Sequence, residues 1–510
     1  MLKAGMGGFR NKYKFASNSQ IGPREDKPMK IYNSLTRGKE DFNQLTPGEV
    51  KMYACGITVY DDCHIGHAMQ AIFFDVIRRY LEYLGNKVTY VRNYTDVDDK
   101  IIAKGIELGC NPLEVSSRYI AESEKDMAAL KVRPATHQPK VSDNIQAIQD
   151  FISGLLNKGA AYISNGEVFF DVPKFKPYGR LSGRKTDELL SEDAPGANKR
   201  SPHDFTLWKP AKPGEPAWDS PWGRGRPGWH IECSALANKF LGKTLDIHGG
   251  GLDIIFPHHE NEIAQSEALN SCKFANYWIH NGLVMVDNRK MSKSLKNFYT
   301  IKEALAKYQA DVIRYMILSF SVSSNVNFSE DNLSAANKRV YLYYQILQQV
   351  DELLSRHPGE ASGKPTGVPA IDSFKNDFTG AMDDFFNTAK VISTLPALFR
   401  AVQEVLLAKR TSEGEKAGIL RQFRQNLGAM SGVLGMLDET AADYTGEFKS
   451  RYIRNNKIDI SFIEARIEER AAARGAGDYI KADAIRKELT QLNILIQDKP
   501  GGGTDWAISA

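Results

Sequence analysis

A strand, a helix and a second strand follow one another between residues 50 and 92, and this order restricts the fold more than any other part of the chain. Val50–Cys55 and Lys87–Arg92 each have the apolar run of a buried strand. Between them, apolar residues recur at helical spacing from Ile72 to Leu84, and Gly85 with the following Asn ends the helix. A β-α-β unit joins parallel strands, and such sheets bind ligands at the carboxyl ends of their strands. The sequence therefore predicts an α/β fold with a parallel sheet.

The predicted helix begins with His64, Gly66 and His67. A helix start presents free amides and the positive end of the helix dipole to a phosphate. Gly66 leaves room for a nucleotide base or ribose, and two imidazoles can donate to phosphoryl oxygens as charge develops. A bare His-x-x-His pattern is also typical of a surface pair or a stray metal site. Its position at a strand-to-helix turn favours the phosphate site.

Residues 248–262 read His-Gly-Gly-Gly-Leu-Asp-Ile-Ile-Phe-Pro-His-His-Glu-Asn-Glu. The three glycines predict a tight turn and a close approach to a ligand, because they lack Cβ. Pro257 suits the first turn of a helix. If a helix begins there, His258 and Glu262 lie on one face, where both can bind one metal ion.

Two further ligands are needed for a tetrahedral zinc site, and Cys55 and Cys233 are the best candidates. The alternative is that His258 caps a helix, Glu262 is solvated and both cysteines are small core residues. For a lone His/Glu pair this alternative is the more common case. The neighbouring motifs favour the metal site.

A basic string, Arg289-Lys290-Met291-Ser292-Lys293-Ser294-Leu295-Lys296, follows a predicted strand at Val284–Val286. A short loop with several cations can close over a departing polyphosphate and reopen afterwards. Most basic runs are only solvated loops. The Lys-Met-Ser-Lys-Ser pattern favours the functional interpretation. Thr300 and Glu303 form a capping box that predicts the start of the next helix.

Later patterns are mostly helical, with predicted helices over Leu333–His357 and Asp383–Arg410. From Arg451 onward, a basic helix, a strand and an exposed Trp506 are typical of RNA binding, although a solvated small domain would have the same pattern. The expected segments are 1–28, a disordered basic extension; 29–154 and 226–320, the two halves of the sheet domain; 155–225, an insertion; 321–450, a helical bundle; and 451–510, a small α+β domain.

Composition is ordinary for a globular enzyme, with 42% hydrophobic and 25% charged residues. No apolar run approaches the ~20 residues that span a bilayer. Five cysteines in 510 residues are too sparse for a disulfide framework and fit a reducing cytosol. The net charge of +4 permits nucleic-acid binding without requiring it. We therefore expect a cytoplasmic protein without membrane spans.

Together these motifs resemble those of the cysteinyl-tRNA synthetases, a family of class I aminoacyl-tRNA synthetases. His64–His67 and Lys290–Ser294 match the two class I signatures, and Gly228–Ser234 and Phe256–Glu262 match cysteine-specific pieces. The resemblance runs from Met29 to Trp506. It implies a Rossmann-type sheet split by a connective-peptide insertion, then a helical stem and an anticodon-binding domain. It also implies a monomer that joins L-cysteine to tRNA-Cys with ATP and Mg²⁺.

The resemblance also assigns residues. It implies one Zn²⁺ on Cys55, Cys233, His258 and Glu262. It implies ATP binding by His64, Gly66, His67 and Lys293, with His64, His67, Lys290 and Lys293 as catalytic residues. It implies a cysteine pocket lined by Thr95, Trp229, His248 and Asp253.

The chain departs from the family pattern at two places. Ser321-Val322-Ser323 replaces a common His-Tyr-Arg, and Ala507 replaces an arginine. Contacts with tRNA are therefore expected to differ there. Two other functions share the core: an ATP-dependent ligase that joins cysteine to a small amino sugar, and a non-catalytic tRNA-binding paralogue. The first needs no residues 451–510, and the second usually loses signature residues that are present here.

Overall fold

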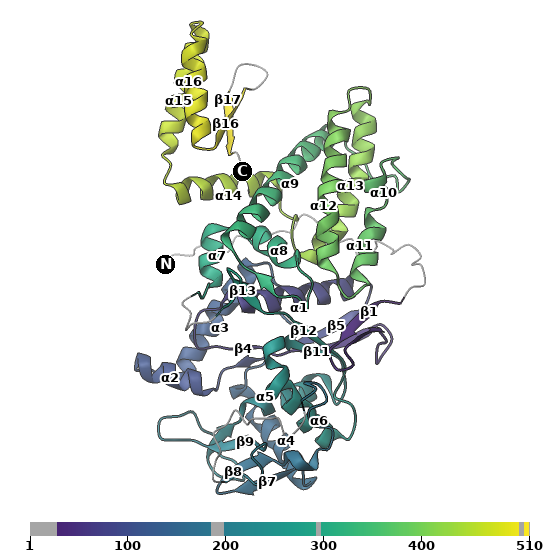
Figure 1. Ribbon diagram of the computed structural model, residues 1–510, viewed down its shortest axis with the longest axis vertical. Coiled ribbons are helices and arrows are strands. Elements are labelled where there is room, and N and C mark those ends of the chain that lie inside the picture. The colour runs from purple at the N-terminus through teal and green to yellow at the C-terminus, as the bar shows by residue number, and fades with distance from the viewer. Residues whose placement is uncertain (1–27, 185–197, 292–296, 499–503, 509–510) are drawn as a thin grey trace, which may run out of the picture.

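The computed structural model describes residues 28–184, 198–291, 297–498 and 504–508. The elements form an elongated molecule with the parallel sheet near its middle (Figure 1). A helical bundle lies on one side of the sheet and the insertion on the other, and the C-terminal helices stand beside the bundle at the same end of the molecule. The extension expected at residues 1–28 lies outside the described residues, apart from Pro28. No helix within the described ranges is both long and apolar enough to cross a membrane.

The central sheet confirms the predicted parallel fold. Its strands, in sheet order, are β12 (Ala275–Asn281), β11 (Leu245–Gly251), β3 (Glu49–Ala54) and β5 (Lys87–Val91). All neighbouring pairs are parallel, with His248 opposite Tyr53 and Met52 opposite Tyr90. Alternate residues of β3 enter different cores: Met52 packs with α1 (Ile65–Tyr83) and the bundle, whereas Tyr53 packs with α5 (Trp229–Leu241). Both faces of the sheet are therefore covered.

The insertion forms a second, antiparallel sheet in the order β10 (Gly225–Pro227), β9 (Phe205–Pro210), β8 (Glu167–Phe170) and β7 (Ala161–Ser164). Helix α4 (Ile145–Asn157) packs on this sheet through Phe151 and Leu155. This helix continues across the border expected after residue 154. The insertion and the sheet domain consequently share one hydrophobic core, which also contains Trp208 and Trp278.

Shorter elements complete this half of the molecule. They are β1 (Lys30–Asn33), β2 (Gly38–Asp41), β4 (Ile57–Thr58), β6 (Tyr94–Thr95), α2 (Asp99–Leu108), α3 (Pro112–Ala129), α6 (Glu260–Asn270), β13 (Val284–Val286), β14 (Arg289–Lys290), α7 (Ile301–Lys307), α8 (Ala310–Leu318) and β15 (Val326–Asn327). Asp287 and Asn288 have positive φ angles and turn the chain from β13 to β14. The capping box predicted at Thr300 and Glu303 is present at the start of α7.

The bundle is helical, as predicted. Its helices are α9 (Glu330–Arg356), α10 (Pro369–Asp372), α11 (Phe374–Met382), α12 (Thr388–Leu407) and α13 (Glu413–Leu434). The predicted Asp383–Arg410 helix starts later, because Phe385 and Phe386 have positive φ angles and Asn387 caps α12.

The C-terminal unit consists of α14 (Ala441–Asn456), α15 (Ile460–Gly475), α16 (Tyr479–Gln491), β16 (Ile494–Asp498) and β17 (Thr504–Ile508). Helix α14 crosses the border expected after residue 450 and packs on α9, with Tyr444 stacked on Tyr344 at 3.7 Å between ring centroids. The prediction of an exposed Trp506 is wrong: the ring is half-buried, and the Lys449 Nζ lies 3.3 Å from its centroid.

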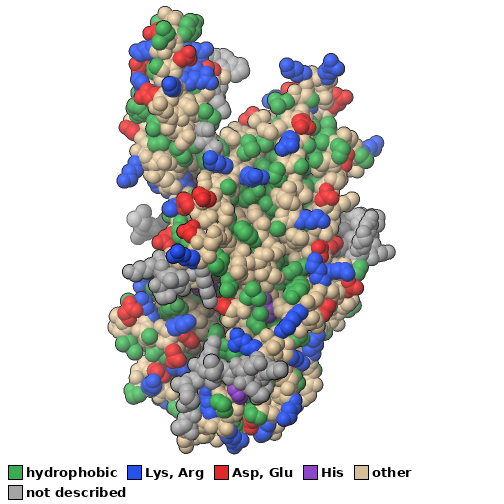
Figure 2. Space-filling view, viewed as in Figure 1, with side chains coloured by type: hydrophobic (Ala, Val, Ile, Leu, Met, Phe, Trp, Pro, Cys, Tyr) green, Lys and Arg blue, Asp and Glu red, His purple; other side chains and the backbone are tan. Residues whose placement is uncertain are grey.

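The basic character of this unit is largely neutralised by pairing. Figure 2 shows Lys and Arg interspersed with Asp and Glu over it. Arg470 and Arg474 both pair with Asp498, at 2.8 and 2.6 Å, and Arg466 pairs with Glu488. The unit therefore presents mixed charge.

A buried arginine joins the sheet domain to the bundle. Arg314 of α8 is fully buried; it donates to the carbonyls of Leu434 (2.8 Å) and Leu130 (3.0 Å) and to the Asp75 carboxylate of α1 (3.0 Å). Removing the guanidinium takes this buried donor from two carbonyls and leaves the buried Asp75 carboxylate with Arg79 as its remaining cation, which is far more costly than losing an exposed pair.

We expect Arg314→Met to lower the free energy of unfolding by about 3–5 kcal/mol. The measurement is urea unfolding followed by circular dichroism. Lys87→Met, which removes an exposed pair with Glu49, is the matched control and should change stability by less than about 1 kcal/mol. Equal effects of the two substitutions would contradict the role given to Arg314.

Candidate active site

Cys55, Cys233, His258 and Glu262 come together at the carboxyl ends of β3 and β11, although they are distant in the sequence. Their donor atoms all lie within 4.8 Å of one another, and all of these side chains are buried. Two thiols, an imidazole and a carboxylate form a donor set suited to a tetrahedral divalent ion of zinc type. The cluster predicted from the sequence is thus assembled, and its chemistry fits such an ion.

Local structure explains how each ligand arrives. Cys55 follows the last residue of β3, and Cys233 lies on the first turns of α5. Within Ile255–His259, Phe256 has an extended backbone (φ −130°, ψ 132°). The helical residues after this kink lead into α6 and bring His258 Nε2 within 3.1 Å of Glu262 Oε1. The prediction that His258 and Glu262 share one helical face is therefore confirmed in effect.

The expected tight turn at the three glycines is wrong. Gly249–Gly251 continue strand β11, and none of them has a positive φ angle. Close packing is the reason for glycine here. A Cβ on Gly249 would lie 2.4 Å from the Phe74 ring and from the Ile279 carbonyl, and one on Gly250 would lie 3.0 Å from the His259 ring.

Charges within the cluster shift the protonation of its members. Burial alone would raise the pKa of Glu262, but His248 and His258 hold it well below its usual range. Against the effect of burial, the same carboxylate and Cys233 raise the pKa of His258 to about 10. Burial opposes ionisation of Cys233 too, yet a hydrogen bond from Cys55 lowers its pKa to about 6. Burial and Cys233 raise the pKa of Cys55 well above its usual value. At neutral pH without metal, protons therefore sit on Cys55 and His258.

Three of the residues expected in the amino-acid pocket adjoin the cluster. His248 Nε2 lies 2.8 Å from Glu262 Oε2, and the Trp229 ring packs on His258 at 4.3 Å between centroids. Thr95 donates to Glu232, the neighbour of Cys233, at 2.9 Å. Asp253 is exposed, and its carboxylate lies beside Gly251, where a Cβ would lie 2.4 Å from Asp253 Oδ1.

Sequence reasoning missed two buried members of this site. The Asn93 Oδ1 accepts from Tyr53 (3.1 Å) and from the Gly56 amide (2.9 Å), and it lies 3.7 Å from the Cys233 sulfur. His259 Nε2 lies 3.3 Å from the Cys55 sulfur. A signal existed for Asn93, because it follows a predicted strand just before Thr95, at the edge where ligands bind.

The second group of predicted site residues, His64, Gly66 and His67, forms a capping structure at the start of α1. The His64 Nδ1 accepts from the amides of Gly66 (3.1 Å) and His67 (3.3 Å), and the His64 amide donates to the His67 Nδ1 (3.3 Å). The two rings stack at 3.6 Å between centroids. Because each Nδ1 accepts a hydrogen bond, each neutral ring carries its proton on Nε2 and can donate from there. A Cβ on Gly66 would lie 2.9 Å from the His64 ring, so this ring position requires glycine.

The basic loop connects directly to this capping structure. The Ile65 amide donates to the Tyr299 carbonyl and the Ile301 amide to the Cys63 carbonyl, at 3.0 and 2.9 Å. Lys302 pairs with Asp62 and Glu122, at 2.6 and 2.8 Å. Only the backbone of Lys290 is described, as part of β14, and Lys293 lies outside the described residues. The end of the loop is thus held beside the start of α1.

The two groups share one edge of the sheet. Gln70 of α1 donates from Nε2 to the Cys55 carbonyl at 2.7 Å. This bond links the helix that begins at His64 and His67 to the candidate metal site, called here the metal-type cluster. A nucleotide phosphate at the helix start and a small molecule at the cluster would therefore be neighbours. This arrangement suits a reaction between the two.

Comparison with known proteins gives the class and then the family. Residues 41–338, more than half of the chain, match the catalytic domain of tRNA synthetases class I (C), and residues 377–438 match a DALR domain. A methionyl-tRNA synthetase of Mycobacterium tuberculosis, solved with methionyl-adenylate, has the same fold, with a TM-score of 0.58 at 14% identity over 78% of this chain and 93% of that one. Fold and sequence thus define a class I aminoacyl-tRNA synthetase.

Relatives that match over nearly their full length identify the family within this class. Cysteine--tRNA ligases of Geobacter metallireducens and Geobacter sulfurreducens are each 46% identical over 94% of this chain and 99% of their own length. One from Thioalkalivibrio sulfidiphilus is 45% identical over the same shares. The chain belongs to the cysteine--tRNA ligase family, which confirms the resemblance found in its motifs.

The protonation of the cluster predicts how metal binding depends on pH. Since Cys55 and His258 hold protons that a metal must displace, we expect Zn²⁺ binding to the metal-free protein at pH 7 to release about two protons. Affinity should rise with pH, because raising pH removes the competing protons. Calorimetry in buffers of different ionisation enthalpy measures the number. Release of no protons would contradict the assigned protonation.

Proposed function

We propose that the chain activates L-cysteine with ATP, forming cysteinyl-adenylate and pyrophosphate, and then transfers cysteine to the 3′ end of tRNA-Cys. The observation that carries this proposal is the shared sheet edge, where a thiol-selecting donor cluster adjoins a helix start suited to phosphate. Membership of the cysteine--tRNA ligase family supports the same reaction. The protein would work in the cytoplasm as a monomer.

One Zn²⁺ would be held by Cys55, Cys233, His258 and Glu262, and it would select cysteine by favouring a soft thiolate over a hydroxyl. The chain's own residues fix the ligands. His248 orients the Glu262 carboxylate, and Asn93 fixes the segments that carry both cysteines. Trp229 covers His258 with its ring, which is itself 37% exposed.

The amino acid would be held by Thr95, Trp229, His248 and Asp253. Thr95 donates its hydroxyl proton to Glu232 and accepts from the Asn93 side-chain amide at 3.3 Å, so one oxygen lone pair remains as an acceptor for an ammonium group. Asp253 is the exposed carboxylate of the set and would attract the same ammonium group. These residues position the substrate, and none acts as a nucleophile.

For ATP, the start of α1 provides the donors. His64 and His67 can each donate from Nε2 to phosphoryl oxygens, while Gly66 allows the tight cap that orients both rings. Lys290 and Lys293, with Mg²⁺, would stabilise the pyrophosphate as it leaves. Because α7 is bonded to the start of α1, closure of the loop would bring these cations to the phosphates.

The molecule that accepts cysteine distinguishes the proposed function from two alternatives. A ligase that joins cysteine to a small amino sugar would activate cysteine without charging tRNA. A non-catalytic tRNA-binding paralogue would bind tRNA without exchanging pyrophosphate. The cysteine--tRNA ligase of Geobacter metallireducens is matched over 99% of its length, C-terminal unit included, which favours the tRNA acceptor.

We expect Cys233→Ser to abolish cysteine-dependent pyrophosphate exchange and to lower zinc content from about one ion per chain to near zero, because a serine hydroxyl is a poor zinc ligand. Exchange assays and elemental analysis check both values. Cys110→Ser, which changes an exposed thiol, is the matched control and should leave both unchanged. Normal exchange by a zinc-free Cys233→Ser protein would refute the zinc-thiolate selection.

Charging of a tRNA transcript with a GCA anticodon tests the acceptor. Because α14 packs on α9, the shortened chain should end at Asn456, leaving α14 in place. We expect full-length protein to charge the transcript, and the shortened chain to keep pyrophosphate exchange while charging at least about tenfold less efficiently. Exchange without any charging by the full-length chain would favour the small-molecule ligase.

A further inference from the structure

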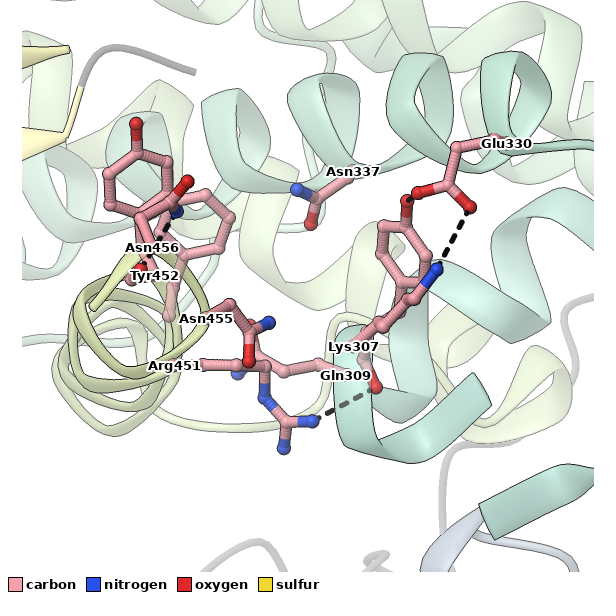
Figure 3. Close-up of a pocket in the computed structure, with 10 residues that line it drawn as sticks. Lys307, Gln309, Glu330, Asn337, Arg451, Tyr452, Asn455 and Asn456 are labelled. Atoms are coloured by element: carbon pink, nitrogen blue, oxygen red, sulfur yellow. Dashed lines mark hydrogen bonds and ion pairs between the residues drawn. The ribbon is translucent and has the colours of Figure 1, made fainter. Parts of the chain in front are cut away.

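A cavity of 410 Å³ lies outside the active site, at the junction of the catalytic domain, the bundle and the C-terminal unit. Figure 3 shows Asn337 of α9 facing Asn455 and Arg451 of α14 across it, with Gln309 at the start of α8 below Asn337 and beside Arg451. A cavity of this size accommodates a nucleoside or another small molecule. None of the residues assigned above to catalysis, metal or substrate lines it.

The cations of the cavity are already paired. Lys307 Nζ lies 3.5 Å from Glu330, and Tyr308 also donates to that carboxylate at 2.6 Å. Arg451 donates to the carbonyls of Leu305 and Tyr308 and to Glu447. Little positive charge is left for a phosphate. The cavity is therefore built to recognise a neutral group.

Carboxamides supply the remaining polar atoms. Gln309 is 8% exposed; its Nε2 donates to the Tyr444 carbonyl at 3.2 Å, but its Oε1 is buried without a partner. Asn337 is half-buried and Asn455 is exposed, and within the described residues the side chain of neither makes a hydrogen bond to the protein. An unpartnered buried acceptor costs free energy that a ligand donor would recover. These atoms call for a partner with several donors and acceptors.

An aromatic surface completes the lining. Tyr452 is half-buried, and its hydroxyl is held by the Leu492 carbonyl at 3.3 Å and by Asn493 at 3.0 Å, which fixes its ring. Phe448 lies beside it, stacked on Tyr341 at 3.9 Å between centroids. Fixed rings beside carboxamides are the combination that stacks a nucleobase and bonds its edge.

The position of the cavity points to RNA as the source of that base. Helix α7 begins just after the basic loop of the active site, and α14 leads into the C-terminal unit. A tRNA that reached from the active site to that unit would pass over this junction. We propose that the cavity binds one unstacked nucleotide of the tRNA through its base; this inference rests on the proposed function.

The test uses Asn337→Ala and Asn455→Ala, with Asn376→Ala, an exposed asparagine of α11 outside the cavity, as the matched control. We expect each cavity variant to raise the Kd for the tRNA-Cys transcript by about fivefold or more, while the control stays at the wild-type value. Cysteine-dependent pyrophosphate exchange should be unchanged in all three, because the cavity lies outside the active site.

Unchanged tRNA affinity in both cavity variants would overturn the proposal. Titration with AMP distinguishes a free nucleotide: AMP binding that Asn337→Ala abolishes, with unchanged tRNA affinity, would assign the cavity to a mononucleotide and also overturn it. Pyrophosphate exchange by the wild-type protein is measured separately. Its absence would count against the proposed function, whereas the tRNA affinities would still decide the role of the cavity.

Discussion

The buried carboxylate of Glu262 is the group around which the catalytic domain is arranged. It is fully shielded from solvent, and an uncompensated charge in such a place costs several kcal/mol. His248 and His258 compensate it at 2.8 and 3.1 Å, and the Cys55 thiol donates to it at 3.2 Å. These partners come from β11, from the turn before α6 and from the end of β3. The fold must therefore hold distant segments in register to keep one carboxylate ionised, and the same requirement assembles the metal-type cluster.

Helix α1 connects this cluster to the rest of the molecule. Near its start, Gln70 bonds the Cys55 carbonyl, and its cap is bonded to the segment that follows the basic loop. Further along, Asp75 receives the guanidinium of Arg314, which also bonds the last turn of α13. One rigid element thus contacts the cluster, the phosphate-type site and the bundle. Each of these connections includes buried or partly buried hydrogen bonds, so α1 fixes the positions of the bundle, the cluster and the phosphate-type site relative to one another.

The elements that the sequence predicted well are those with strong local patterns. The β-α-β unit follows from apolar periodicity, and the Thr300 cap follows from a box that is read within four residues. The cluster ligands were predicted because each stood beside an unusual motif. What local patterns could not show is packing between distant segments. The glycines before Leu252 suggested a turn. Glycine is required there instead because the rings of Phe74 and His259 leave no room for a Cβ. Trp506 seemed suited to exposure, but Lys449 covers its ring, and that contact depends on how α14 meets β17.

Selection of cysteine over serine is the demand that explains why the cluster is so deeply buried. A pocket that sensed only shape would separate two such similar substrates by about 1–3 kcal/mol. Under the proposed function the separation comes instead from ligand chemistry, since a thiolate binds zinc well and a protonated hydroxyl binds it poorly. That preference depends on excluding water, which would otherwise compete as an oxygen ligand. Trp229 over His258 and His248 stacked on Trp278 enclose the donors with aromatic surface. Under the proposed function, these enclosing residues would therefore contribute to specificity together with the ligands.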